Sequence, residues 1–139
     1  MDSQETRIRV RYAETDQMGI VYHANYVVWM EVGRVELCRS RGISYRDMEA
    51  EGILLTVAEV NCRYIYPAHY DDEVSVEARI VKAHPRMVIF GYVMKRVADG
   101  RILVTGETKH VFCNRELQPS KLPAKYFEVF GMESAVVHR

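Results

Sequence analysis

The sequence predicts an α+β domain in which one long helix lies across an antiparallel sheet. Three observations support this fold class: an alternating strand comes first, a long run with helical spacing follows, and four further runs have the period of a strand. Because short turns separate those four runs, their pairing should be antiparallel. A chain of 139 residues fits one compact domain, so we assign residues 1–139 to a single unit.

The first strand is predicted over Thr6–Tyr12, where apolar and arginine side chains alternate. Ile8, Val10 and Tyr12 would share the inward face of this strand, while the arginines would face solvent. A loop over Ala13–Met18 then leads to the helix.

The long helix is predicted over Ala24–Arg41, with Gly42 ending it. Its charged residues gather toward the C-terminal half, where cations suit the negative end of the helix dipole. Apolar side chains surround the first turns, so we expect the N-terminal end to be buried on nearly every side. The stripe that should face the sheet consists of Tyr26, Met30, Gly33 and Leu37.

Two short helices are also expected, one between its cap Ser44 and Gly52 and one in the tail over Pro123–Phe130. Between these two helices lie the four remaining strands, and short turns at 83–86 and 98–100 join the last three of them. One helix cannot cover both faces of this sheet and its edges, so we expect a dimer or a larger assembly. The four strands are predicted over Ile53–Tyr66, Asp72–Ala83, Arg86–Val97 and Arg101–Cys113.

The composition limits the classes of partner and the compartment. Nineteen basic residues balance nineteen acidic ones, which argues against broad binding to nucleic acid or to an anionic membrane. Cys38, Cys62 and Cys113 form no paired motif, so they are predicted to be reduced core cysteines. No apolar signal core and no run of membrane-spanning length is present, and the expected location is the cytoplasm.

Asp16 and His23 stand directly before the most apolar part of the helix. Each has an ordinary explanation, because Asp16 suits a turn and His23 suits a helix entry or the core. Together they suit catalysis: the first N–H groups of a helix lack intrahelical partners and can hold a negative oxygen. A carboxylate, such donors and an imidazole can transfer an acyl group to water.

Other chemistries have less support in the sequence. No GxSxG elbow is present, and the histidines lack the spacing of metal ligands. No GxxxxGK[ST] or GxGxxG loop indicates a nucleotide. We therefore expect neither a metal ion nor a cofactor.

At "YAETDQMGIVYHANYVVWMEVGR" the sequence resembles the hotdog-fold acyl-CoA thioesterases of the 4-hydroxybenzoyl-CoA thioesterase type, including the YbgC-like branch. The later stretch "CRYIYPAHYDDEVSVEA" is also similar to that family, and the resemblance covers nearly the whole chain. The residues that match the family pattern are Tyr12, Thr15, Asp16, Gly19, Val21, His23 and Tyr26.

The resemblance implies a hotdog fold, in which a five-stranded antiparallel sheet wraps around a long central helix. It also implies dimers with sites at the subunit interface, commonly paired into homotetramers. Asp16 would attack the thioester carbonyl or activate the water that does, with His23 hydrogen-bonding in the site or orienting water. Glu31 and Glu36, on the helix, are less favoured rivals. The amides that would hold the oxyanion are those around the helix start, Tyr22, His23, Ala24 and Asn25.

The substrate implied is an acyl-CoA, with coenzyme A entering only as part of the substrate. Its phosphates would lie near basic groups, and our candidates are Arg63, Lys82 and Arg86. Tyr12, Tyr26 and Trp29 would suit a short or aromatic acyl group, although they equally suit the core. Two alternatives remain open: an acyl-carrier-protein thioesterase, and a non-catalytic acyl-CoA-binding or regulatory module.

Overall fold

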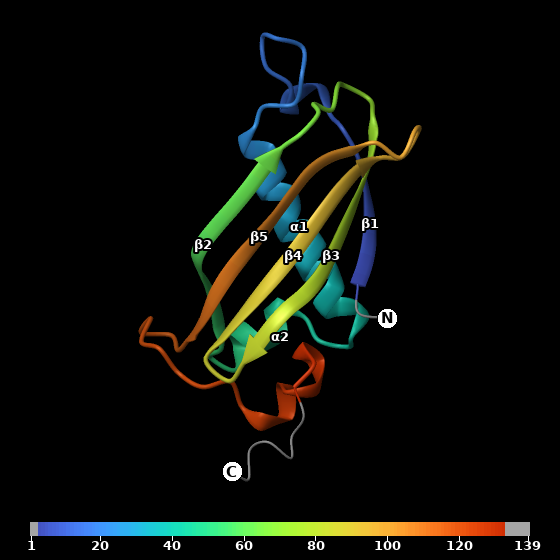
Figure 1. Cartoon of the computed structure of the whole chain (residues 1–139). Helices are drawn as coiled ribbons and strands as arrows, with labels where there is room; N and C mark the ends of the chain where they lie inside the picture. Colours follow the sequence, from blue (N-terminus) through green and yellow to red (C-terminus); the bar gives the residue numbers. More distant parts are fainter. Residues whose placement is uncertain (1–2, 133–139) are drawn as a thin grey trace.

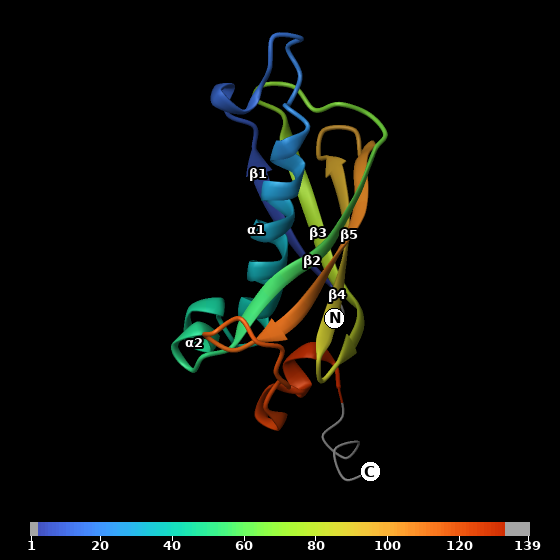
Figure 2. The same ribbon diagram turned by 90° about the vertical axis from the view of Figure 1, so that its left-hand side faces the viewer.

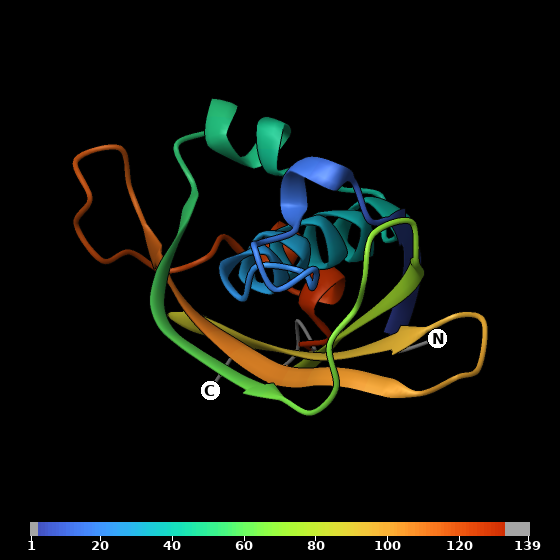
Figure 3. The ribbon, with the colours of Figure 1, turned by 90° about the horizontal axis from the view of Figure 1, so that it is seen from above.

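The computed structural model describes residues 3–132 and confirms the α+β class. The chain forms β1 (Ser3–Arg9), the 3-10 turn η1 (Tyr12–Glu14), α1 (Ala24–Ser40), α2 (Tyr45–Ala50), β2 (Leu54–Tyr64), β3 (Glu73–His84), β4 (Met87–Arg96), β5 (Ile102–Cys113), and the 3-10 turns η2 (Ala124–Tyr126) and η3 (Glu128–Phe130). The sheet lies across α1 in Figure 1 and curves around it when seen from above in Figure 3.

All neighbouring strands in the sheet are antiparallel, in the order β1-β3-β4-β5-β2. The predicted hairpins β3–β4 and β4–β5 are confirmed. The expectation that β2 turns directly into β3 was wrong, because β2 pairs with β5 at one edge of the sheet. Pro67 lies in the connection between β2 and β3, and its missing N–H cannot extend a strand ladder. This connection instead lies against the Asp16 loop, where Val21 N donates to Ala68 O at 2.9 Å.

The predicted apolar stripe of α1 packs against β1, β3 and β4. At Gly33 the approach is so close that an added Cβ would lie 2.9 Å from Val76 Cγ1. The expectation of a helix start buried on nearly every side was wrong for the single chain, because Tyr22 is 47% exposed and Val28 is 54% exposed. Helix α1 has little contact with β2, which forms one edge of the sheet and is the strand nearest the viewer in Figure 2.

The predicted end of the first strand and the predicted tail helix were both wrong. The first strand ends at Arg9, so Tyr12 does not face inward; it begins η1 and is 78% exposed. The tail forms the two separate turns η2 and η3 instead of one short helix, and Gly131, with a φ of 81°, follows the second turn. The three cysteines are free; Cys38 and Cys113 are buried as predicted, whereas Cys62 on β2 is half-buried. Within residues 3–132 no helix is long and apolar enough to cross a membrane.

A chain of polar side chains lies in the core between α1 and the sheet. Tyr92 Oη lies 2.6 Å from Thr108 Oγ1, which is 2.9 Å from His110 Nε2. Arg34 Nη1 donates to Tyr92 Oη at 3.5 Å. Burial and the nearby Arg34 charge lower the pKa of His110 to about 4. His110 is fully buried, so the folded protein holds it neutral.

This histidine should make the protein sensitive to mild acid. The pKa of His110 is lower in the folded state than its ordinary 6.5, so the unfolded chain binds the proton more readily. Stability is therefore complete above pH 6.5 and should fall by about 3 kcal/mol as the pH drops toward 4. Urea unfolding at several pH values measures how steeply the free energy of unfolding falls with pH.

The comparison variant is His110→Asn, which should show a shallower fall than the wild type over the same range. His84→Asn, at an exposed position, serves as the control and should keep the wild-type slope. Equal slopes for His110→Asn and the wild type would contradict the assignment.

Candidate active site

The loop that carries Asp16 is a compact ring closed at its base by a bridge between Thr15 and Val21. Asp16 N donates to Ile20 O at 2.8 Å, and Gly19 N donates to Asp16 O at 3.0 Å. Gly19 has a φ of 80°, a left-handed conformation that side chains other than glycine adopt at a cost. An added Cβ at Gly19 would meet no atom within 4 Å, so the requirement is for the dihedral angle and not for space.

The carboxylate of Asp16 is held at one oxygen only. Met18 N donates to Asp16 Oδ1 at 2.8 Å, an Asx-type turn that fixes the rotamer. No hydrogen bond from residues 3–132 reaches Oδ2, which leaves one oxygen of the half-buried carboxylate available for chemistry. Asp16 and His23 make no direct side-chain hydrogen bond in the described part of the chain.

Four amides at the start of α1 were predicted to hold the oxyanion. Two of them are already hydrogen-bonded within the described residues, and two are not. Tyr22 N donates to Glu14 O at 2.8 Å, and Asn25 N donates to Tyr22 O at 2.9 Å. The amides of His23 and Ala24 have no acceptor among the described residues. These two N–H groups, at the positive end of the helix dipole, are therefore free to bind a negative oxygen.

Glu14, which the sequence analysis did not single out, joins the loop to the helix. Its Oε1 accepts from Arg11 N at 2.8 Å, and its Oε2 accepts from the buried indole of Trp29 at 3.1 Å. Its carbonyl oxygen also accepts from the Asn25 side chain at 2.8 Å. Burial would raise the pKa of Glu14, but the hydrogen bonds from Arg11 and Trp29 outweigh it and lower the pKa. Glu14 is thus a buried, ionised carboxylate, and both of its oxygens accept hydrogen bonds.

A pocket of about 240 Å³ opens beside His23. Tyr64 Oη donates to the His23 carbonyl at 3.1 Å, which ties β2 to the helix start. Partial burial and the neighbouring Cys62 raise the pKa of Tyr64 to about 12, so this hydroxyl stays protonated. The lining is mostly apolar and aromatic: Ile20, Val21, His23, Tyr26, Tyr64, Ile65, Tyr66 and Pro67.

The predicted aromatic residues differ in their surroundings. Tyr26 lines the pocket but is only 3% exposed, and its hydroxyl accepts from Ala68 N at 3.0 Å. Burial raises the pKa of Tyr26. Trp29 is a core residue in edge contact with Tyr26. Tyr12 instead packs edge-on against Tyr70 and does not line the pocket.

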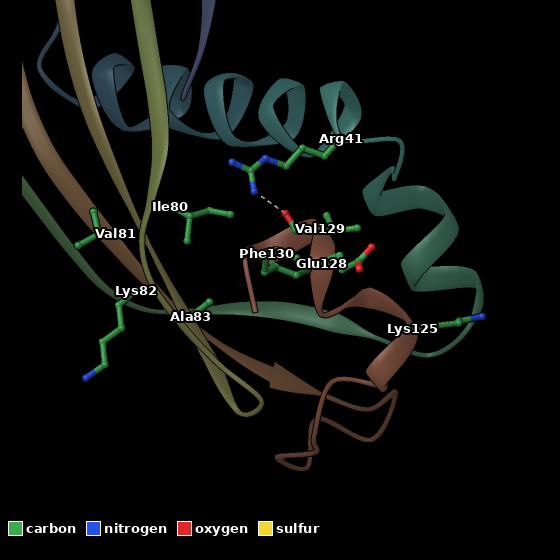
Figure 4. Close-up of a pocket in the computed structure, with 10 residues that line it drawn as sticks. Arg41, Ile80, Val81, Lys82, Ala83, Lys125, Glu128, Val129 and Phe130 are labelled. Atoms are coloured by element: carbon green, nitrogen blue, oxygen red, sulfur yellow. Dashed lines mark hydrogen bonds between the residues drawn. The ribbon is translucent and has the colours of Figure 1, made fainter. Parts of the chain in front are cut away.

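Two of the three predicted phosphate-binding residues, Lys82 and Arg86, lie at the opposite end of α1 from the Asp16 loop. Lys82 lines a separate cavity of about 800 Å³ beside the C-terminal end of α1. In Figure 4 Lys82 points away from Arg41, whose guanidinium donates to Val129 O at 2.8 Å. Arg86 lies in the turn after β3, at that same end. The 17 residues of α1 separate its two ends by about 25 Å.

Neither Arg63 nor the two rival glutamates line the pocket. Arg63 is exposed on β2, one residue before Tyr64. The rival carboxylates lie outside the pocket, since Glu31 is exposed and Glu36 pairs with Arg39 at 3.3 Å. Among the residues described, no group of three or more His, Cys, Asp or Glu side chains is arranged to hold a metal ion.

The structure also places a cation at the pocket rim that sequence reasoning missed. The guanidinium of Arg101 stacks 4.2 Å from the ring centroid of Tyr66, a lining residue. Arg96 lies over the same ring at 5.2 Å but is engaged by Asp99 at 2.9 Å. Sequence offered no signal for this stack, because Tyr66 and Arg101 lie on different connections.

The comparisons with known proteins agree with this geometry. Residues 10–130 match the sequence profile of the thioesterase-like superfamily. The chain belongs to this superfamily.

Other members resemble it over most of its length. The chain is 41% identical, over 84% of its length and 83% of the relative, to a putative acyl-CoA thioesterase YneP of Bacillus subtilis. It is 32% identical to a DHNA-CoA thioesterase structure from Staphylococcus aureus, with a TM-score of 0.87 covering 99% of this chain and 91% of that one.

A third likeness concerns the fold alone. A mutant 4-hydroxybenzoyl-CoA thioesterase in complex with 4-hydroxybenzoyl-CoA shares 20% identity, with a TM-score of 0.82 over 94% of this chain and 100% of that one. The hotdog fold predicted from the resemblance is thereby confirmed, and this superfamily member has the sheet-wrapped helix of thioesterases.

The left-handed conformation of Gly19 gives a direct test of the loop. Gly19→Ala should lower the free energy of unfolding by about 1–2 kcal/mol, because the left-handed conformation brings Cβ close to the following carbonyl. Gly19→Asn should lose less, since asparagine adopts this conformation more readily. Urea denaturation compares the two variants, and equal losses would show that the dihedral angle is not the constraint.

Proposed function

We propose that this protein hydrolyses acyl-CoA thioesters to a free acid and coenzyme A. The observation that carries the proposal is the pair of open amides, His23 and Ala24, at a helix start joined to the Asp16 loop and to an apolar pocket. A thioester carbonyl can accept from these amides, and charge on its oxygen in the transition state strengthens both bonds. The named functions of the similar proteins support the same reaction.

Asp16 is the catalytic carboxylate in this proposal. As a general base it takes a proton from water while the water oxygen adds to the carbonyl carbon. The tetrahedral oxyanion then collapses, the C–S bond breaks, and the coenzyme A thiolate leaves and is protonated. His23, whose ring lines the pocket, orients the water or hydrogen-bonds within the site.

A nucleophilic route uses the same residue differently. The Asp16 carboxylate would then add to the carbonyl, expel the thiolate and form a mixed anhydride, which water hydrolyses. A single turnover in oxygen-18 water tests the nucleophilic route. Label in the Asp16 carboxylate shows that an anhydride formed and that water attacked its aspartyl carbon. Label in the product acid alone is the outcome of general-base catalysis, and also of an anhydride that water attacks at its acyl carbon.

The substrate assignment rests on the pocket and its rim. A small pocket lined by aromatic rings suits a short-chain or aromatic acyl group. Arg101, stacked on Tyr66, is placed to meet a phosphate of coenzyme A. Arg63, Lys82 and Arg86 remain candidates for this role across a subunit interface. The reaction needs no metal or further cofactor, and the cytoplasm is the proposed location.

The uncovered face of β2 supports a homodimer. Helix α1 does not extend over β2, and the apolar side chains of Val57, Val60 and Tyr64 are between 45% and 51% exposed. A second copy would cover this face and the free edge of β2, and would enclose the site. Half-buried Ile89, Val93 and Val111, on other strands of the sheet, support the pairing of two dimers into a tetramer.

The function is tested with a panel of acyl-CoA substrates and release of free thiol. Asp16→Asn keeps an oxygen for the Met18 amide but cannot take a proton, so kcat should fall by about 10²–10⁴-fold. Asp47→Asn, on exposed α2, is the matched control and should retain full activity. Full activity of Asp16→Asn would reject the assignment.

Two alternative functions are separated by the same panel. Faster hydrolysis of carrier-protein thioesters than of the corresponding acyl-CoA would favour an acyl-carrier-protein thioesterase. Binding of acyl-CoA without turnover by the wild type would favour a non-catalytic module.

The proposed dimer predicts that Val60→Lys yields a monomer, because a lysine would be buried without a partner at the interface. Ile102→Lys, at a similarly exposed apolar position on β5, is the control and should leave the assembly intact. Light scattering after size-exclusion chromatography gives the mass. An unchanged mass for Val60→Lys would contradict an interface on β2.

A further inference from the structure

Glu14 is the point at which three separate parts of the site meet. Its carboxylate accepts from the Arg11 amide, two residues after the end of β1, and from the Trp29 indole in the second turn of α1. Its carbonyl accepts from Tyr22 N and from the Asn25 side chain, both at the helix start. No other residue described in the structure links the strand end, the loop base and the helix in this way.

The position of Asp16 depends on this junction. Glu14 is two residues before Asp16, and the bridge between Thr15 and Val21 closes the loop immediately after it. Thr15 Oγ1 also donates to Tyr12 O at 2.7 Å, and this bond further restricts the conformation of the backbone at the base of the loop. Rotation about the Glu14 anchor would move Asp16 relative to the open amides of His23 and Ala24.

We propose that the buried carboxylate of Glu14 is a positioning residue that fixes Asp16 relative to the two open amides at the start of α1. This inference rests on the proposed thioesterase function for its catalytic consequence. Its structural basis is independent of the substrate. An error of about 1 Å in the placement of a catalytic group can lower the rate roughly 10²-fold, so loss of this anchor should lower kcat.

The geometry of the carboxylate specifies a sharp variant. Donors approach both oxygens: Arg11 N at Oε1, and Trp29 Nε1 with Arg11 Nη2 at Oε2. Glu14→Gln keeps the size of the side chain but replaces one oxygen with an NH₂ group. That group must then face a donor, whichever way the amide is turned. The anchor should loosen without leaving a cavity.

Glu14→Gln should lower kcat by about 10- to 100-fold with KM nearly unchanged, because the loss is in the placement of Asp16. Trp29→Phe removes one donor and should have a smaller effect. In the double variant Glu14→Gln/Trp29→Phe the NH₂ group no longer faces the indole N–H, and the other donor at this oxygen, the exposed Arg11 side chain, can turn into solvent. The double variant should therefore recover part of the activity lost in Glu14→Gln.

Glu36→Gln, at another glutamate paired with an arginine, is the matched control and should keep wild-type kcat. The free energy of unfolding of every variant is measured in parallel. A merely structural role for Glu14 would lower stability and leave kcat per folded molecule unchanged. Wild-type kcat for Glu14→Gln, or losses that simply multiply in the double variant, would overturn the proposal.

A second readout does not depend on activity. Trp29 is the single tryptophan, so its indole N–H gives one resolved NMR signal. In Glu14→Gln this signal should shift, together with the amide signals of Asp16 and Met18. Unchanged signals for the Asp16 loop would overturn the positioning role even if the wild type proved inactive on every thioester. If the wild type hydrolyses no thioester but the signals shift in Glu14→Gln, only the proposed function is rejected.

Discussion

Helix α1 packs against β1, β3 and β4 so closely that Gly33 leaves no room for a Cβ beside Val76, and the position of the site follows from this contact. The contact places the helix toward one side of the concave sheet. The first turn of α1 then meets the Asp16 loop and the connection between β2 and β3. The inward face of β2 is left uncovered, which creates both the pocket beside His23 and the surface on which a second copy would pack.

Two buried charges lie in different parts of this arrangement. Glu14 is surrounded by donors, which lower its pKa and keep it ionised next to the loop. Arg34 faces the hydroxyl of Tyr92 and, through Thr108, the neutral ring of His110. The first group orders the site, whereas the second lies in the core toward the other end of α1. Activity and acid stability should therefore respond to different residues.

Much of the fold was readable from the sequence because its signals are local. The start of α1 at Ala24, the Ser44 cap of α2 and both hairpin turns were predicted from the spacing of apolar residues and from turn residues. The β2–β5 pairing was not, since it joins segments about 50 residues apart and no local pattern encodes it. The surroundings of Tyr12 were mistaken because its alternation continues past the last paired residue, Arg9.

The candidate site also combines residues that the sequence indicated with contacts that it did not indicate. Asp16, Gly19 and His23 were identified from a motif whose residues are close in sequence, and the sequence by itself determined the family, the helix start and the candidate carboxylate. The tertiary structure decided which amides are open, that Glu14 is buried, and that Arg101 stacks on Tyr66. Burial and hydrogen-bond partners are properties of contacts between distant segments, and such contacts exist only once the sheet has closed around α1.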